Sequence, residues 1–240
     1  MSPRVGPYGL LSHERIIAAA IEVADEAGLE AMTMKRVAAR LGAGAMSLYR
    51  HVSDKEELIG NMVDQVTGEY AYPDPSGLSW REAMHVLARQ DWDAFLAHPW
   101  MLTATTTVTP PFGTASLSAM EWALSALDEV GLSPDAAARM IMTINNYVQG
   151  SARVVLGDRR AEAEDDPGLA WKQRLHDVEL KDFPHLSRLI AHPVPARERD
   201  WFEGGLDVIL DGVQARHNAS PDTAGITRSH EPIDTRTTES

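Results

Sequence analysis

The residues with the clearest chemical character form a cluster of basic side chains between positions 33 and 55. The basic residues of this window are Lys35, Arg36, Arg40, Arg50 and Lys55. A single acid, Asp54, accompanies them, so the window carries +4, whereas the whole chain carries −13. The rest of the chain must therefore carry −17. A small positive patch on an acidic protein indicates contact with a polyanion, such as the phosphate backbone of a nucleic acid.

Signatures of enzymatic chemistry are absent from the sequence. The nine histidines are scattered, and neither the H-E-x-x-H pattern of zinc hydrolases nor the G-x-x-x-x-G-K-[ST] loop of nucleotide-binding proteins occurs. No pair of carboxylates stands in an apolar setting that would favour acid–base catalysis. We therefore expect no enzymatic activity, no catalytic residue and no metal or cofactor site.

The composition predicts a globular protein of the reducing cytoplasm. A chain of 240 residues is long enough for a sizeable core. It contains no cysteine, which excludes disulfides and thiolate metal sites. The first 30 residues lack a basic leader followed by an apolar block, and no apolar run approaches the roughly 20 residues that span a bilayer. We therefore expect a cytoplasmic location and no membrane contact.

Two short helices joined by a glycine turn are expected to position the basic cluster. The first begins at Thr33, whose hydroxyl suits an N-cap, and ends at Gly42. In the second run, Leu48 and Val52 lie one helical turn apart and can hold it against the first helix. This spacing is typical of a helix-turn-helix motif, whose second helix reads the DNA major groove. Similar helix pairs also occur in proteins that never touch DNA, so the pattern alone leaves both interpretations open.

The detailed residues of this region closely resemble the N-terminal domain of the tetracycline-repressor (TetR) family. The resemblance rests on T-M-K-R-V-A-A-R-L-G followed by G-x-x-x-M-S-L-Y-R-H-V-S-D-K-E-E-L, and on an amphipathic helix beginning at Ser12. It implies a ligand-responsive transcriptional regulator, usually a repressor, that binds palindromic operator DNA as a homodimer. The residues that it places at DNA are Thr33, Lys35, Met46, Ser47, Tyr49, His51 and Lys55.

The side-chain chemistry agrees with these implied DNA contacts. Ser47 and Met46 are small or flexible enough to reach the edges of bases, whereas tyrosine and lysine side chains suit phosphate. Arg50 is also a candidate, because it could form a bidentate pair with guanine, although it could equally lie along the protein surface. We expect Ser47, Arg50, His51 or DNA shape to carry sequence specificity.

Apolar periodicity predicts an all-α fold with no strand and no internal repeat. The expected helices run from Ser12 to Gly28, from a capping box of Ser53 and Glu56 to about Tyr70, from a capping box of Ser79 and Glu82 to His98, and over 115–130, 133–156 and 198–215. We predict a flexible arm at 1–11 and a helix-turn-helix DNA-binding domain at 12–57. A larger ligand-binding and dimerisation domain follows at 58–216, and a disordered tail at 217–240.

A weaker resemblance links residues 78–215 to the tetracycline-repressor-like C-terminal domain, through His98-Pro99-Trp100 and Asn-Tyr-Val-Gln-Gly at 146–150. It implies a small-molecule effector that enters between the helices. Candidate ligand-binding residues have polar tips within apolar helices: His85, Trp92, Trp122, Asn145, Asn146, Gln149 and Arg153, with Met84 and Met120 as adaptable walls. No histidine and glutamate pair aligns with the magnesium ligands of the founding member, so tetracycline itself is not the expected effector.

The last predicted helix has a broad apolar face, made of Trp201, Phe202, Leu206, Ile209 and Val213. The resemblance implies that this helix and the one beginning at Ser133 form a four-helix interface between two copies. Alternatively, the face could close a core within one chain. A second alternative concerns function, namely a helical dimer that binds a small molecule or a protein without binding operator DNA.

Overall fold

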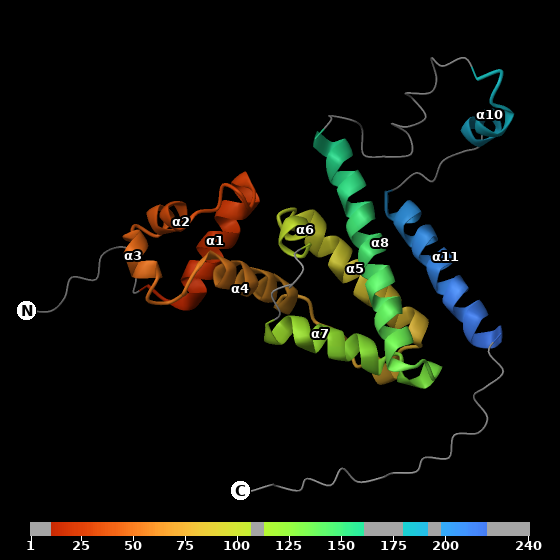
Figure 1. Ribbon diagram of the computed structural model, residues 1–240, viewed down its shortest axis with the longest axis horizontal. Coiled ribbons are helices and arrows are strands. Elements are labelled where there is room, and N and C mark those ends of the chain that lie inside the picture. Colours follow the sequence, from red (N-terminus) through yellow and green to blue (C-terminus); the bar gives the residue numbers. More distant parts are fainter. Residues whose placement is uncertain (1–10, 107–112, 161–179, 192–197, 220–240) are drawn as a thin grey trace, which may run out of the picture.

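The computed structural model describes residues 11–106, 113–160, 180–191 and 198–219, and every regular element within these ranges is helical (Figure 1). The helices are α1 (His13–Ala27), α2 (Met34–Arg40), α3 (Ala45–Leu48), α4 (Lys55–Gly68), η1 (Pro75–Gly77), α5 (Trp80–Ala97), α6 (Met101–Ala104), α7 (Thr114–Ser125), η2 (Asp128–Val130), α8 (Pro134–Arg160), α10 (Pro184–Ala191) and α11 (Glu198–Ala219). The predicted arm and tail fall almost entirely outside the described ranges. Within those ranges, no helix combines the length and hydrophobicity that crossing a lipid bilayer requires.

Helices α1, α2 and α3 form a small unit, here called the head, at one end of the molecule (Figure 1). Ile16 and Ala20 of α1, Val37 of α2 and Leu48 of α3 are fully buried in it. Because these residues recur at helical spacing, each short helix turns one apolar stripe inward and leaves its polar face to solvent. Helix α4 leads from the head into the larger body, which comprises α5 to α8 and α11, while α10 stands apart from them (Figure 1).

Several helix starts carry favourable capping residues. The side chains of Ser12, Thr33, Ser79 and Ser133 each accept a hydrogen bond from a backbone N–H three residues later, and Ser79 with Glu82 forms the complete capping box. The glycine stops at Gly28 and Gly42 are also confirmed, since both have positive φ, as does Gly131 after η2.

The predicted capping box of Ser53 and Glu56 is wrong by one residue. Asp54 is the N-cap of α4, and its carboxylate accepts a hydrogen bond of 2.8 Å from the backbone N–H of Glu57. The Glu57 carboxylate in turn accepts hydrogen bonds from the backbone N–H and the hydroxyl of Ser53. Aspartate and serine are both favourable N-caps, so the motif alone could not fix the register. Lys55 thereby becomes the first residue of α4.

The core of the body lies among α5, α8 and α11. Ile144 of α8 and Leu206 and Leu210 of α11 are fully buried. The ring of Trp92 stacks on that of Phe202, with centroids 4.3 Å apart, and so joins α5 to α11. Helix α7 packs against α4 on the other side of the body (Figure 1).

The predicted dimer face divides between the inside and the outside of the chain. Phe202 and Leu206 are buried against α5 and α8, so the expectation that they form an interface between copies is wrong. Ile209 and Val213 are partly buried against the same core, and Trp201 is 48% exposed. Helical periodicity alone could not say which part of so broad a stripe faces inward. Helix α11 also continues to Ala219, beyond the predicted end at Ala215.

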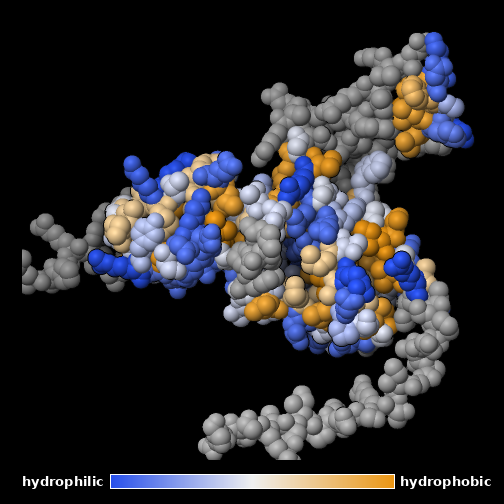
Figure 2. Space-filling model, in the orientation of Figure 1, coloured by the Kyte–Doolittle hydropathy of each residue, from blue (hydrophilic) through white to orange (hydrophobic). Residues whose placement is uncertain are grey.

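A different stripe of α11 is open to solvent. Val208 is 72% exposed, and Gly204 and Gly212 are exposed one turn before and one turn after it. On α8, Val154 is 55% exposed and Gly150 is exposed one turn before it. Figure 2 shows hydrophobic side chains reaching the surface over these two helices. Small residues of this kind allow another helix to approach closely.

Candidate DNA-binding surface and ligand cavity

The side chains predicted to meet DNA lie on the surface of the head. Met46 is 77% exposed and Tyr49 46% exposed. Thr33, Lys35 and Arg50 are also exposed, and Ser47, His51 and Lys55 are partly buried. Leu48 and Val52 are buried beneath them, as the one-turn spacing predicts. The register of this segment therefore presents the polar and flexible side chains outward.

The second helix of the motif is short. It has four α-helical residues, Ala45–Leu48, and its N-cap Gly44 makes no side-chain capping bond. Helical turns continue beyond it, since the backbone N–H groups of His51 and Val52 both donate to the Leu48 carbonyl. A reading helix of this length offers few side chains to a groove, so a single copy has a small contact surface.

The positive charge of the head is weaker in space than in the sequence window. Arg40 forms ion pairs with Glu22, at 2.9 Å, and with Glu26, both from α1. The hydrogen bond from Arg40 holds the pKa of Glu26 below its ordinary value. Counting charges in a window missed this because the two acids lie more than ten residues away in sequence. Of the basic residues, Lys35, Arg36, Arg50 and Lys55 remain without a carboxylate partner among the described residues.

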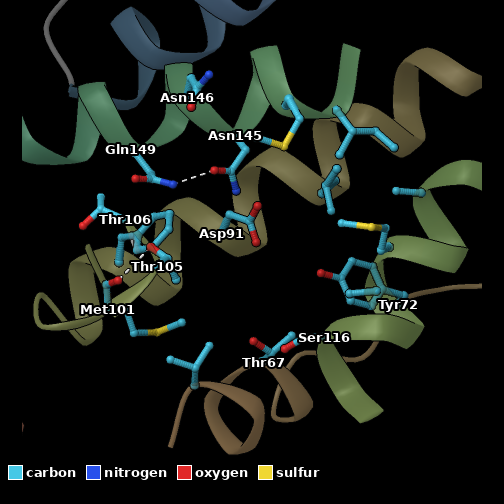
Figure 3. A pocket seen from close by; sticks show the side chains of 18 residues that line it. Thr67, Tyr72, Asp91, Met101, Thr105, Thr106, Ser116, Asn145, Asn146 and Gln149 are labelled. Carbon is cyan, nitrogen blue, oxygen red and sulfur yellow. Dashed lines mark hydrogen bonds between the residues drawn. The ribbon is translucent and has the colours of Figure 1, made fainter. Parts of the chain in front are cut away.

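A cavity of about 520 Å³ lies in the body, lined by side chains from α4 through α8 (Figure 3). Much of its wall is apolar, including Leu87, Phe95, Met101, Met120 and Met142. Its size and mixed lining fit a small organic molecule. Methionines adapt readily to the shape of a ligand.

The structure brings together three of the predicted ligand-binding residues at this cavity. Asn145, Asn146 and Gln149 of α8 all line it, and the Gln149 side-chain amide donates a hydrogen bond of 2.6 Å to Asn145 Oδ1. Met120, predicted as an adaptable wall, lines it as well. Their helical spacing places the Asn145 and Gln149 side chains on the face of α8 that is turned to the cavity, whereas the exposed Asn146 points away from that face (Figure 3).

The other predicted ligand-binding residues do not line this cavity. Trp92 is buried in the core against Phe202, and Met84 is fully buried. Trp122 Nε1 donates to the Pro73 carbonyl at 2.7 Å, and its ring packs behind Tyr72, which does line the cavity. Aromatic residues within apolar helices thus serve packing here, and spacing alone cannot distinguish the two roles.

The two basic candidates also have structural partners. His85 lies 2.9 Å from a Glu203 oxygen and 3.2 Å from an Asp207 oxygen, on the side of α5 that faces α11. Arg153 donates to the Leu102 carbonyl at 2.9 Å and so ties α8 to α6. Neither belongs to the cavity lining.

Asp91, which is not among the predicted ligand-binding residues, directs its carboxylate into the cavity (Figure 3). Desolvation by the surrounding protein raises its pKa to about 7. Asp91 is only partly buried, and its exposed surface faces the interior of the cavity. A signal was present in the sequence, because Leu87, Asp91 and Phe95 are four residues apart and an acid therefore interrupts an apolar stripe of α5.

Hydroxyl groups add further polar positions to the cavity wall. The Ser116 hydroxyl is buried with no hydrogen-bond partner within the described structure. Thr67, Tyr72, Thr105 and Thr106 also line the cavity. Burial raises the pKa of Tyr72, with a further contribution from Asp91, so its phenol is neutral at physiological pH. Among the described residues, no group of three or more potential metal ligands occurs.

Comparison with known proteins covers both parts of the chain. Residues 16–62 match the family model described as bacterial regulatory proteins, tetR family. Residues 72–217 match the tetracyclin repressor-like, C-terminal domain.

Individual relatives extend over most of the chain. The HTH-type transcriptional repressor DrrR1 of Streptomyces coeruleorubidus is 34% identical over 226 residues, which cover 88% of this chain and 80% of that protein. An HTH-type transcriptional regulator of Saccharopolyspora erythraea is 31% identical over 86% of each chain. Among solved structures, the Streptomyces coelicolor TetR family protein ActR in complex with actinorhodin has a TM-score of 0.72 and 27% identity, over 87% of this chain and 99% of that one.

Proposed function

Because the chain belongs to the tetracycline-repressor family of bacterial regulatory proteins, we propose that it is a ligand-responsive repressor that binds operator DNA as a homodimer. The observation that carries this proposal is the pairing of an exposed helix-turn-helix surface in the head with a cavity in the body that has an apolar wall and several polar side chains. Its family consists of transcriptional regulators, and we propose no catalytic activity. We propose a cytoplasmic location, because operator DNA is found there in bacteria.

We assign DNA contact to Thr33, Lys35, Met46, Ser47, Tyr49, Arg50, His51 and Lys55. The short α3 supports a dimer, because two copies reading a palindrome would double the small contact surface of one head. For the interface between copies we propose the exposed stripes of α8 and α11 around Val154 and Val208 in place of the buried Phe202 and Leu206.

The effector is proposed to occupy the cavity of the body. ActR has been solved in complex with actinorhodin, which supports a small molecule as the class of ligand in this fold. Helix α4 supplies Val63 and Thr67 to the cavity and leads directly into the head, so a ligand that moves α4 also moves the DNA-binding surface.

The test measures binding of the purified protein to a labelled duplex from the region upstream of its own gene. Fluorescence anisotropy detects the binding at a series of salt concentrations. We expect Tyr49→Ala and Lys55→Ala to weaken binding about tenfold or more, because a phenol and an ammonium group both suit phosphate contact. The dimer carries two copies of each residue, so Lys55→Ala should also reduce the slope of log K against log salt by about 2.

The matched control is Arg139→Ala, which removes one exposed cation from α8, far from the head in sequence and paired with Asp135. It should leave affinity unchanged within about twofold. Unchanged affinity in both head variants, or a control that weakens binding equally, contradicts the proposed docking surface.

A further inference from the structure

The formal charge of the described cavity lining is negative, with no positive charge to balance it. Among the described residues that line the cavity, Asp91 is the only one that carries a formal charge near neutral pH, and no lysine, arginine or histidine is present. The phenol of Tyr72 is neutral. The cavity therefore has a negative or neutral electrostatic potential, which disfavours anionic ligands.

The Asp91 carboxylate also lacks a partner. No hydrogen bond or ion pair joins it to any described residue. Its helix neighbours Leu87 and Phe95, which also line the cavity, are apolar. A carboxylate in such a place is destabilised until a donor or a positive charge reaches it. Asp91 is thus available to a ligand in a way that the paired acids of the body, Glu203 and Asp207, are not.

The remaining wall specifies what must accompany the positive charge. The thioether and aromatic side chains of Met101, Met120 and Phe95 favour a broad apolar group. Neutral hydrogen-bonding groups accompany the charge, namely the Asn145 and Gln149 amides and the hydroxyls of Ser116, Thr67, Tyr72, Thr105 and Thr106. The volume of about 520 Å³ accommodates a ligand with several fused or linked rings.

We infer that the cavity selects apolar, ring-containing molecules that carry a protonated amine, with Asp91 as the counter-charge. The inference rests on the proposed function in taking such a molecule as the effector, but the recognition of the amine stands on the cavity alone. An ammonium group placed at Asp91 gains a charge-assisted hydrogen bond in a partly desolvated site, where such bonds are strong. The same molecule without the charge keeps its apolar contacts and loses this interaction.

A matched pair of fluorescent probes tests the inference. Dansylcadaverine joins an apolar naphthalene ring system to a primary amine, and its N-acetyl derivative keeps the ring and an N–H donor but is neutral. Each probe is titrated with the full-length protein, and the blue shift of dansyl emission gives its dissociation constant. We expect the amine to bind at least about tenfold more tightly than the acetylated probe.

Asp91→Asn removes the charge with little change in shape and should bring the two probes to within about twofold of each other. The control, Glu121→Gln, removes an exposed acid from α7 that lies outside the cavity lining and should keep the full preference. Equal binding of both probes to the wild-type protein, absence of amine binding at millimolar concentration, or a preference that survives Asp91→Asn overturns the inference.

Operator binding, measured separately without probe, distinguishes this inference from the proposed function. A protein that prefers the amine through Asp91 but binds no operator supports the cavity assignment and contradicts the repressor. A protein that binds its operator but shows no preference for the amine supports the repressor and contradicts the cavity assignment.

Discussion

At the scale of single residues, Asp91 couples the stability of the protein to pH. Its pKa in the folded state is raised to about 7 by desolvation, whereas an unfolded aspartate titrates near its ordinary value of about 3.9. Between these values the folded state binds a proton that the unfolded state has lost, so stability decreases as pH rises through this window. Ionisation of the unpaired Asp91 therefore destabilises the folded protein, and this loss of stability is complete above about pH 7.

Asp91→Asn should remove this dependence. Relative to wild type, the free energy of unfolding of the variant should increase by roughly 1–3 kcal/mol between pH 5 and pH 8, allowing for partial exposure of the carboxyl. Urea denaturation at equal protein concentration measures the difference at each pH, and other titrating groups cancel in the comparison. A difference that is the same at both pH values would show that Asp91 is solvated like a surface acid.

Residue-level prediction succeeded where one element decides the outcome and failed where several elements meet. The outward direction of Met46 and Tyr49 followed from burial of Leu48 in a single short helix. The partners of Arg40 and the setting of Asp91 depend on packing between helices, which a window of sequence cannot display. The sequence nevertheless contains a signal for Asp91, because it is an acid within an apolar stripe of α5.

At the scale of elements, an ion-pair cluster joins α5 to α11. Arg81 pairs with Asp207 at 2.7 Å, and His85 and Arg89 both contact Glu203. Burial opposes ionisation of Glu203, but its hydrogen bonds and attraction to Arg89 and His85 outweigh burial and lower its pKa. The hydrogen bond from Arg81 similarly lowers the pKa of Asp207. Lowered values stabilise the folded state above the unfolded pKa, and this contribution is lost as pH falls.

Glu203→Gln should therefore destabilise the protein at pH 7 by about 1–2 kcal/mol, because it leaves Arg89 and His85 without their charged partner. The difference from wild type should shrink as pH falls through the lowered pKa of Glu203, because the carboxylate is then protonated in the folded state as well. Asp135→Asn, which removes an acid from the exposed pair with Arg139, is the control and should change stability by less than about 0.5 kcal/mol. Equal effects of the two substitutions at pH 7 would contradict a structural role for the cluster.

Helix starts and stops were the most predictable elements of the fold. Thr33 and Ser79 act as N-caps where the sequence places them, because capping depends on residues within one turn. The inward face of α11 was less predictable. Its apolar residues extend around more than one side, and only the positions of α5 and α8 decide that Phe202 faces inward and Val208 outward.

At the scale of the whole molecule, two connections between the head and the body stand out among the described residues. Helix α4 is the covalent connection, and it also lines the cavity through Val63 and Thr67. The second attachment is Asp25 of α1, which accepts a hydrogen bond of 2.7 Å from Trp100 Nε1 and lies 2.8 Å from His98 Nδ1. Trp100 immediately precedes α6, whose Met101 lines the cavity. Ligand and DNA sites therefore share a short chain of contacts.

Because the effect of one ligand on another is reciprocal, operator DNA should weaken binding of dansylcadaverine by the same factor that the amine weakens binding of DNA, about fivefold or more. Asp25→Ala removes the second attachment and lets the head move independently of α6, so this factor should fall to less than half. Glu30→Ala removes an exposed acid of the head and should preserve it. For the wild type and each variant, amine titrations with and without saturating operator give this coupling factor. An undiminished factor in Asp25→Ala would assign the coupling to α4 alone, because that helix would then be the remaining physical link between the occupied cavity and the DNA-reading surface.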